Sequence, residues 1–581
     1  MVYYSGYLRR AGIVFLGLFI FWLILVGRIF YLQFFNFFFL KEFASRQHQV
    51  HIELSPRRGN IYDARLRPQA INLNVDSLYA VPSQIEDREK VVKQLSSILS
   101  LDTDYLREKL SRKKAFVWIA RRLSDQKAKE ISDLKIKGLG FIKETKRVYP
   151  NGYLCSHILG FANIDNVGIE GVELFYDNYL KGKPGFGLFL RDARGKILDL
   201  WEKVVLPQNG FDLVLTIDEV IQYIAEKQLD IVFKVFRAKA ASIIIMDPFT
   251  GEILAMANRP TFNLNDLKKI NSENMRNRAI ADMFEPGSSF KIVTAAAALE
   301  EGKVNENDKF FCENGMYRVA NHILHDHQPH GWLTFKEVIE QSSNIGVTKV
   351  AQILGPAIIF RYAKLFGFGS ILGIDLPGEV KGKVKPPHQW SKTSIGAIPI
   401  GHEIGVNALQ LVSAISVVAN GGFLLRPYIV KEIRDEYGVQ IKENRPQVIR
   451  KVITPQTAFR LKEILTGVVE NGTGKLAKIE DIRVAGKTGT AQKIGEDGRY
   501  VHNRFVASFV GFAPADHPRI AMCVIVDEPH PYYFGGVVCA PVFKKVAEEV
   551  LNYLETYSSP KEDKPIKENI ERLVSTKNES E

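Results

Sequence analysis

Residues 286–302 read PGSSFKIVTAAAALEEG, which combines a strong helix pattern with a reactive pair of side chains. A Pro-Gly turn precedes the segment, alanines fill its interior, and Gly302 is available to end the helix. If Ser288 opens this helix, Lys291 lies one turn further on, and its amine can reach the Ser288 hydroxyl. A helix N-terminus also presents N–H groups that favour developing negative charge on a reacting oxygen.

Two further short motifs supply partners for this pair: residues 342–344 (SSN) and residues 487–490 (KTGT). A serine hydroxyl is a weak nucleophile without a base, and a lysine is a poor base unless burial or a second cation lowers its pKa. Lys487 can supply that second cation, and Ser342 can relay a proton between the two amines. The three motifs together predict a serine that is activated by lysine.

The KTGT motif is typical of an edge strand at an active site. A glycine there lets substrate backbone approach closely, and the neighbouring Lys and Thr side chains can bind a terminal carboxylate. The backbone N–H groups of Ser288 and Thr490 form the natural oxyanion-hole pair. Asn344 is expected to hold Lys291 and the substrate amide. We therefore predict a catalytic group and a substrate-binding group: Ser288, Lys291, Ser342, Asn344 and Lys487 in the first, and Ser343, Thr488, Gly489 and Thr490 in the second.

The first forty residues predict the topology of the chain. Residues 11–27 carry no charge (AGIVFLGLFIFWLILVG), and with the apolar residues that follow they can cross a hydrocarbon core of about 30 Å. Arg9 and Arg10 precede this segment, which predicts a cytoplasmic N-terminus. The rival interpretation is a cleaved signal peptide, which needs small residues where residues 34–39 read FFNFFF. We therefore expect an uncleaved signal anchor, with the chain after about residue 40 outside the cytoplasm.

Composition divides the chain into four parts. Residues 1–45 hold the N-terminus and the anchor, and residues 46–210 form a mixed module of strands and helices without a nucleophile motif. Residues 211–556 form a large α/β body, in which a strand, a turn at residues 248–251 and a second strand predict a hairpin. Residues 557–581 are polar and highly charged, which predicts a disordered tail.

Charge and cysteine content exclude fewer classes of function than the motifs do. The chain has 77 Lys and Arg against 65 Asp and Glu, a formal net charge of +12 that suits nucleic acid, anionic lipid or an anionic cell wall equally well. No basic stripe interleaved with aromatic residues occurs, so we predict no nucleic-acid partner. The cysteines lack C-x-x-C spacing, which argues against a zinc ribbon, and buried free thiols are a simpler interpretation than a Cys523–Cys539 pair.

Three other patterns have both a functional and a structural interpretation. Residues 321–330 (NHILHDHQPH) hold four histidines, which suggests a metal site, but the stretch leads directly into the segment before the SSN motif. Gly486 and Lys487 resemble the end of a phosphate-binding loop, which would need a glycine where Asp481 stands. Asp282 and Glu285 form a carboxylate pair just before the nucleophile, for which a solvated or structural role is the simpler interpretation.

In this order and with these gaps, the three motifs resemble the set found in penicillin-recognising serine acyl transferases. The wider chain resembles the class B penicillin-binding proteins, from the anchor to about residue 555. The resemblance covers RGNIYD from residue 58, the stretch VYPNGYLCSHILGFANIDNVGIEGVE from residue 148, and YYFGGVVCAPVF from residue 532. The second of these stretches, together with GKTGTAQKIGEDGRY, is most similar to the division-specific (FtsI) type.

The resemblance implies a mixed α/β transpeptidase domain of the penicillin-recognising serine enzyme fold, behind a transmembrane helix and an elongated α+β pedestal. It implies a peptidoglycan D,D-transpeptidase in which the D-Ala-D-Ala end of a stem peptide acylates Ser288 and an amine of a neighbouring stem then attacks. β-Lactams would inhibit it. The implied partners are a membrane glycan polymerase of the FtsW type and other division proteins, at the cytoplasmic (inner) membrane. No metal or organic cofactor is implied.

The sequence departs from the family pattern at two places. The family usually has a glycine-bearing turn after the position of Asp63, where residues 64–68 read ARLRP. Asn407 and Ala408 stand where the family commonly shows Thr-Pro. Both departures concern local turn geometry, and neither touches the predicted catalytic residues.

Other functions remain alternatives to a division transpeptidase. Within the family, the alternatives are an elongation or a sporulation enzyme. A β-lactamase would need a base that activates water for deacylation, and the rate at which the protein turns over a β-lactam would distinguish it. A β-lactam sensor would need several membrane spans and a signalling domain. A catalytically silent scaffold would lack Ser288 or Lys487, and both are present.

Overall fold

The computed structural model describes residues 3–39, 49–112, 116–191, 197–269, 271–495 and 498–557. The chain forms two compact units: residues 1–57 with 182–209, and residues 58–181 with 210–581. The tail predicted for residues 557–581 lies outside the described residues, apart from Tyr557.

The first unit contains a long apolar helix and a small sheet. Helix α1 (Tyr3–Phe34) has a segment from Leu8 to Phe34 with a mean hydropathy of 2.6, and none of it is buried within the protein. These 27 residues span about 40 Å as a helix, so the segment is long and apolar enough to cross a membrane. The sheet is antiparallel, in the order β1 (Gln49–Leu54), β6 (Gly185–Arg191), β7 (Ile197–Val205).

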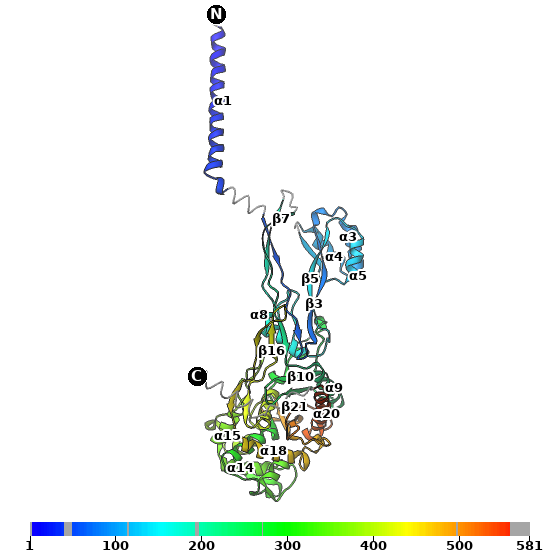
Figure 1. Ribbon diagram of the computed structural model, residues 1–581, viewed down its shortest axis with the longest axis vertical. Helices are drawn as coiled ribbons and strands as arrows, with labels where there is room; N and C mark the ends of the chain where they lie inside the picture. Colours follow the sequence, from blue (N-terminus) through cyan, green and yellow to red (C-terminus); the bar gives the residue numbers. More distant parts are fainter. Residues whose placement is uncertain are drawn as a thin grey trace. The chain divides into compact units, whose positions relative to one another are not determined.

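A five-stranded antiparallel sheet forms the centre of the second unit (Figure 1). Its order is β10 (Ile253–Arg259), β9 (Ala240–Met246), β21 (Ile520–Asp527), β20 (Tyr500–Ala513), β19 (Ala485–Ile494). Strands β9 and β10 are the hairpin predicted from the sequence. Strand β19, which begins with the KTGT motif, lies at the edge of the sheet, as the sequence predicts.

Helices cover both faces of this sheet because its strands are apolar on both faces. Ile243 and Ile245 pack in one core with α9 (Glu219–Val235) and α20 (Ala540–Tyr557). The alternate residues Ile244 and Met246 pack in the larger core on the opposite face, with α17 (Ala408–Ala419). Side chains of a strand alternate between faces, so one continuous apolar run supplies both cores.

The larger core is completed by five helices, of which α12 begins at Lys291 and α14 begins at Asn344. They are α12 (Lys291–Glu300), α13 (Phe335–Glu340), α14 (Asn344–Leu354), α15 (Pro356–Leu365) and α18 (Pro455–Glu470). Short strand pairs lie between these helices: β11 (Lys309–Phe311) with β14 (Trp332–Thr334), β12 (Met316–Val319) with β13 (His322–His325), and β15 (Phe423–Leu425) with β18 (Val448–Lys451).

A second sheet joins strands from both sides of the predicted boundary at residue 210. Its order is β17 (Gln440–Glu443), β16 (Val430–Arg434), β8 (Asp212–Leu215), β2 (Ile61–Tyr62), β3 (Pro68–Ala80), β4 (Val117–Ala120), and β5 (Leu139–Val148) also pairs with β3. Helices α3 (Arg88–Leu99), α4 (Thr103–Ser111) and α5 (Asp125–Asp133) form a separate small core on β3 and β4. The boundary near residue 210 stays a prediction, and this sheet shows that the chain is continuous across it.

Charged residues from three distant sequence segments meet in a buried cluster, to which β5 of this sheet contributes Arg147. The Glu173 carboxylate accepts hydrogen bonds from Arg58 Nε at 2.6 Å and from Arg147 Nε at 2.7 Å. Tyr149 donates to the same carboxylate at 3.1 Å, and Arg58 also contacts Asp177 at 2.7 Å. Glu173 and Arg58 are fully buried, so each depends on the other for its charge compensation.

The two departures from the family pattern have local explanations. Leu66, in the turn after Asp63, adopts a left-handed conformation with φ of 62°, which is the conformation that a glycine would adopt without strain. Asn407 is the N-cap of α17, where its side chain accepts from Gln410 N and the Gln410 side chain bonds back to Asn407 N. Asparagine is a good N-cap residue, so this helix starts normally without Thr-Pro.

Candidate active site

Ser288 lies in a short 3₁₀ turn, Gly287–Phe290, directly before α12. Its neighbours Gly287 and Ser289 are buried, whereas Ser288 itself is half-buried and partly accessible to solvent. The α-helix therefore begins at Lys291, three residues later than the sequence suggests. Within the described residues, the Ser288 hydroxyl has no hydrogen-bond partner, and the expected bond from Lys291 is not formed in this state.

The Lys291 amine is instead held by the SSN motif. Its Nζ donates to Ser342 O at 2.6 Å, to Asn344 Oδ1 at 2.8 Å and to Ser342 Oγ at 3.1 Å. The Lys487 amine approaches the same hydroxyl, with Nζ 3.0 Å from Ser342 Oγ. The Ser342 hydroxyl thus lies between two lysine amines, and the three motifs come together from positions far apart in the sequence.

Burial sets the protonation of both amines. Lys291 and Lys487 are fully buried. Burial lowers the pKa of Lys291 to about 7, against the opposing influence of the Asp326 carboxylate. Burial also lowers the pKa of Lys487 far below its ordinary value, and the charge of Lys291 lowers it further. A neutral amine is therefore available near pH 7, which an exposed lysine would not provide.

Asp326 organises the SSN motif, and the sequence did not single it out. Its Oδ1 accepts from the backbone N–H of Asn344 at 2.5 Å and of Ile345 at 3.0 Å, and its Oδ2 accepts from Ser343 Oγ at 2.6 Å. A carboxylate at the N-terminus of α14 is favoured by the helix dipole. Ser342 is held in a left-handed conformation with φ of 59°, which only such surrounding contacts can maintain.

The structure gives the Ser343 hydroxyl a different role from the substrate binding predicted for it. The residue is 2% exposed, and its hydroxyl accepts from Gly346 N as the N-cap of α14. Its remaining contacts are with Asp326 and with Cys312 Sγ at 3.3 Å. Because these contacts occupy the hydroxyl and bury it, Ser343 positions the motif and is not available to substrate.

Strand β19 passes very close to the turn that holds Ser288. A Cβ atom on Gly287 would lie 2.6 Å from Thr490 O, and one on Gly489 would lie 2.5 Å from Ser289 Oγ. Both positions therefore require glycine. The close approach places the backbones of Ser288 and Thr490 side by side. The Thr490 hydroxyl accepts from Gly535 N at 3.0 Å, and the Thr488 hydroxyl lies 2.9 Å from that of Thr473.

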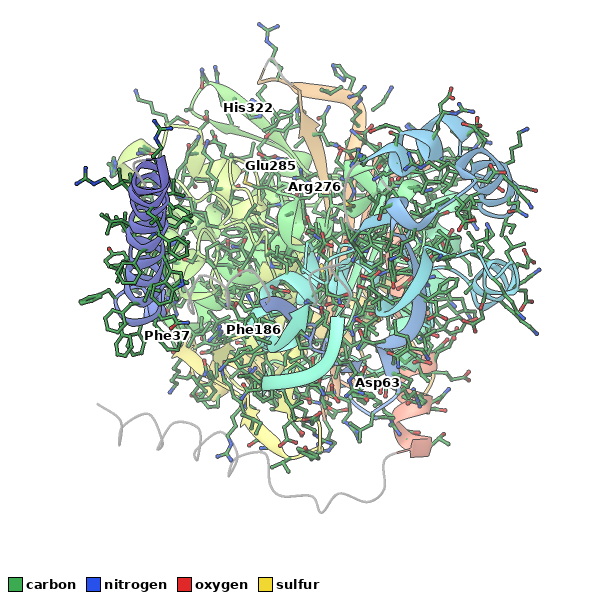
Figure 2. The ribbon with its side chains drawn as sticks, turned by 90° about the horizontal axis from the view of Figure 1, so that it is seen from above. Phe37, Asp63, Phe186, Arg276, Glu285 and His322 are labelled. Atoms are coloured by element: carbon green, nitrogen blue, oxygen red, sulfur yellow. The ribbon has the colours of Figure 1, made fainter. Side chains whose placement is uncertain are left out.

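A cavity of about 890 Å³ adjoins this site, and Asn344, Ala491 and Gln492 contribute to its lining. Glu285 and His322 also line it, and both are labelled in Figure 2. The two carboxylates noted before the nucleophile have separate surroundings. Asp282 pairs with Arg276 and Arg278, whereas Glu285 contacts His402.

The remaining sequence patterns fall outside the catalytic chemistry. The histidine-rich stretch forms β13 and the turn that carries Asp326, and the described residues contain no group of three or more potential metal ligands. All four cysteines (Cys155, Cys312, Cys523 and Cys539) are buried free thiols. Burial raises the pKa of each.

Two family models match the chain. The penicillin-binding protein transpeptidase domain matches residues 241–548, which is more than half of the chain, and the penicillin-binding protein dimerisation domain matches residues 53–215. Both matches agree with the expected fold class, a mixed α/β body behind a second module.

Relatives extend the match to almost the whole chain. Stage V sporulation protein D of Bacillus subtilis is 36% identical, over 97% of this chain and 87% of its own. Peptidoglycan D,D-transpeptidase FtsI of Escherichia coli is 33% identical, over 91% of this chain and 89% of its own. Penicillin-binding protein 3 of Mycobacterium tuberculosis, solved with aztreonam, superposes with a TM-score of 0.69 at 26% identity, over 88% of this chain and 98% of that one.

The chain therefore belongs to the penicillin-binding proteins of class B. It is a peptidoglycan D,D-transpeptidase, with the transpeptidase domain and the two-part architecture of that family.

Proposed function

We propose that Ser288 is the nucleophile of this transpeptidase. The observation that carries the proposal is the convergence of Lys291 and Lys487 on the Ser342 hydroxyl beside a half-buried serine. Ser288 Oγ would attack the carbonyl carbon of the penultimate D-Ala, and its proton would pass to the neutral Lys291 amine. The C–N bond then breaks, terminal D-Ala leaves with the proton, and an amine of a second stem attacks the ester.

The other residues of the site have separate roles in this proposal. Ser342 is placed to carry a proton between the two amines, since each Nζ lies about 3 Å from its hydroxyl. The backbone N–H groups of Ser288 and Thr490 would stabilise the oxyanion, because Gly287 allows the turn that holds Ser288 to approach strand β19. Lys487, Thr488 and Thr490 would bind the terminal carboxylate, and Gly489 would let the substrate lie against β19. Asn344 would hold the substrate amide as well as Lys291.

Acylation by a labelled β-lactam tests the nucleophile. Wild-type protein should gain one label, and mass spectrometry of its peptides should place that label on Ser288. The Ser288→Ala variant should gain none while it keeps the wild-type melting temperature. An unlabelled wild-type protein, or a label on another residue, would overturn the assignment.

We further propose a single membrane span with a cytoplasmic N-terminus. Arg9 and Arg10 lie at the start of the apolar segment of α1, where the positive-inside rule puts the cytoplasm. The module of residues 46–210 would then be a non-catalytic pedestal, and residues 211–556 the catalytic domain outside the membrane. Protease added to intact spheroplasts should digest the catalytic domain; its protection would contradict this topology.

For the cellular role we propose septal cross-linking, beside a membrane glycan polymerase of the FtsW type and other division proteins. The proposal rests on the likeness to FtsI over 91% of the chain. A sporulation role is the second candidate, because stage V sporulation protein D is similar over 97% of the chain. Depletion of the protein from cells distinguishes these roles. Filamentous cells would support division, and normal growth with defective spores would support sporulation. Round cells would indicate elongation.

A further inference from the structure

The wall of the cavity beside Asn344 holds a polar cluster that the proposed chemistry does not use. Glu285 Oε2 lies 2.7 Å from His402 Nδ1 and 3.1 Å from the Tyr500 hydroxyl, and Glu285 Oε1 accepts from Glu403 N at 2.8 Å. The Glu285 side chain is only 10% exposed, and that of His402 is 27% exposed. We call Glu285, His402 and Tyr500 the carboxylate–imidazole cluster.

The contact with Glu285 fixes the hydrogen-bonding character of His402. A carboxylate can only accept, so the proton must lie on His402 Nδ1. In the neutral ring, Nε2 is then an acceptor, and within the described residues no partner occupies it. In that neutral form His402 presents a lone pair at Nε2, with the negative charge of Glu285 behind it. Such a pair suits a donor that carries positive charge, such as a primary ammonium group.

Backbone contacts join this cluster to the nucleophile and to the cavity wall. His402 directly follows Gly401, whose carbonyl accepts from Gly287 N at 3.2 Å, one residue before Ser288. Beyond Thr490, residues 491–494 of β19 line the same cavity. An extended chain rises about 3.3 Å per residue. A donor whose terminal carboxylate lies at the KTGT motif therefore brings the residue before D-Ala-D-Ala into the cavity.

The charges of the cavity wall favour this placement of an ammonium group. Lys385 is paired with Glu403 at 2.8 Å, and Lys493 is paired with Asp527 and Glu528. Lys383 is exposed and has no ion pair within the described residues. The carboxylate–imidazole cluster is thus the site for a cation in this cavity. The positive charge of Lys383 opposes the binding of that cation.

We propose that the carboxylate–imidazole cluster binds the side-chain amine of the donor stem, in the residue that precedes D-Ala-D-Ala. This proposal rests on the proposed function, in which every stem carries an amine that can serve as acceptor. The cluster would select donors whose amine is still free, and would disfavour donors in which cross-linking has already converted it to an amide.

Two penicillins that differ at one amine test the proposal on the full-length protein in detergent. One is 6-aminopenicillanic acid acylated with 6-aminohexanoic acid, which reproduces the length of a lysine side chain, and the other is its N-acetyl derivative. The wild-type protein should be acylated about tenfold faster by the free amine, the factor expected for one charge-assisted hydrogen bond. Equal second-order rate constants for the two compounds would overturn the proposal.

Substitutions then locate the contact. His402→Phe and Glu285→Gln should each reduce the preference, taken as the ratio of the two rate constants within the same variant, from about tenfold to about unity. His322→Gln is the matched control, because His322 lines the same cavity without a carboxylate partner, and it should keep the preference. Lys383→Ala should increase the preference, since it removes the opposing cation. A preference that survives His402→Phe, or that falls in Lys383→Ala, contradicts the proposal.

The two penicillins also separate this proposal from the proposed function. If neither compound acylates the wild-type protein, the assignment of Ser288 fails. If both acylate it at the same rate, Ser288 stands and the amine site alone is refuted.

Discussion

At the scale of single residues, the site depends on lysines that are unusual because they are buried. Lys291 and Lys487 share the Ser342 hydroxyl, and the low dielectric around them disfavours two positive charges at once. The structure therefore predicts the direction in which the acylation rate changes with pH.

Acylation of the wild-type protein should accelerate as the pH rises through about 7. In the proposed mechanism the neutral form of Lys291 is the base, and burial lowers its pKa to about 7. Second-order rate constants with a neutral-side-chain penicillin between pH 5.5 and 8.5 measure this. A rate that is flat across the range would contradict the assignment of Lys291 as the base.

Asp326→Asn should shift that pH profile to lower pH. The Asp326 carboxylate raises the pKa of Lys291, so its removal lowers the pKa further. The same change weakens the contacts to Asn344 N and Ser343 Oγ, at a cost in unfolding free energy of about 1–3 kcal/mol. The pH profile distinguishes the two effects, because a loss of stability alone would reduce the rate without moving the profile.

At the scale of elements, the turn after Asp63 shows how this chain tolerates a missing glycine. Leu66 has φ of 62° and a side chain that is half exposed, so little packing offsets its backbone strain. The Asp63 side chain stabilises the turn by accepting from Arg65 N and Arg67 N, at 2.9 and 2.7 Å. These contacts hold the turn in a conformation that leucine does not favour.

Leu66→Gly should be more stable than Leu66→Ala by about 1 kcal/mol in urea unfolding, because both remove the side chain but only glycine relieves the left-handed strain. At an ordinary helix or strand position the order is reversed, since glycine is less stable than alanine. An alanine variant as stable as the glycine variant would show that the backbone of residue 66 is not strained.

Some elements followed directly from the sequence, and others did not. The β9–β10 hairpin follows from apolar runs around a turn, and the edge strand β19 follows from the KTGT motif. Asp326 was missed because it lies among histidines that suggested a metal site, and because its partners are 17 or more residues away. His402 is 117 residues from Glu285, and no local pattern links the two.

At the scale of the whole molecule, the buried cluster around Glu173 ties distant parts of the chain together. Arg58 and Glu173 lie in two stretches that carry the family resemblance, and Arg147 directly precedes the second of them. The sequence could not show that they meet, because their contacts depend on long-range folding. Burial by itself would raise the pKa of Glu173, but Arg147 and Arg58 together hold it below its ordinary value.

Glu173→Gln should lower the free energy of unfolding by about 3–5 kcal/mol at pH 7, because it leaves two buried arginines without their counter-charge. The wild-type contribution is complete above the unfolded pKa of about 4.3 and is lost as the pH falls through the lower folded value. The difference between the two proteins should therefore shrink under acid conditions. Glu86→Gln, at an exposed pair with Lys137, should cause no measurable change.

The burial of all four thiols has a practical consequence for observing this enzyme at work. Within the described residues every cysteine is buried, and burial raises the pKa of each thiol. Thiolate-selective reagents should therefore leave all four unmodified. A cysteine introduced at the exposed Lys303, in the loop after α12, would then be a unique attachment point for a fluorophore. A dye there would lie at the far end of α12 from the proposed nucleophile, where it can report the binding of a β-lactam or a stem peptide.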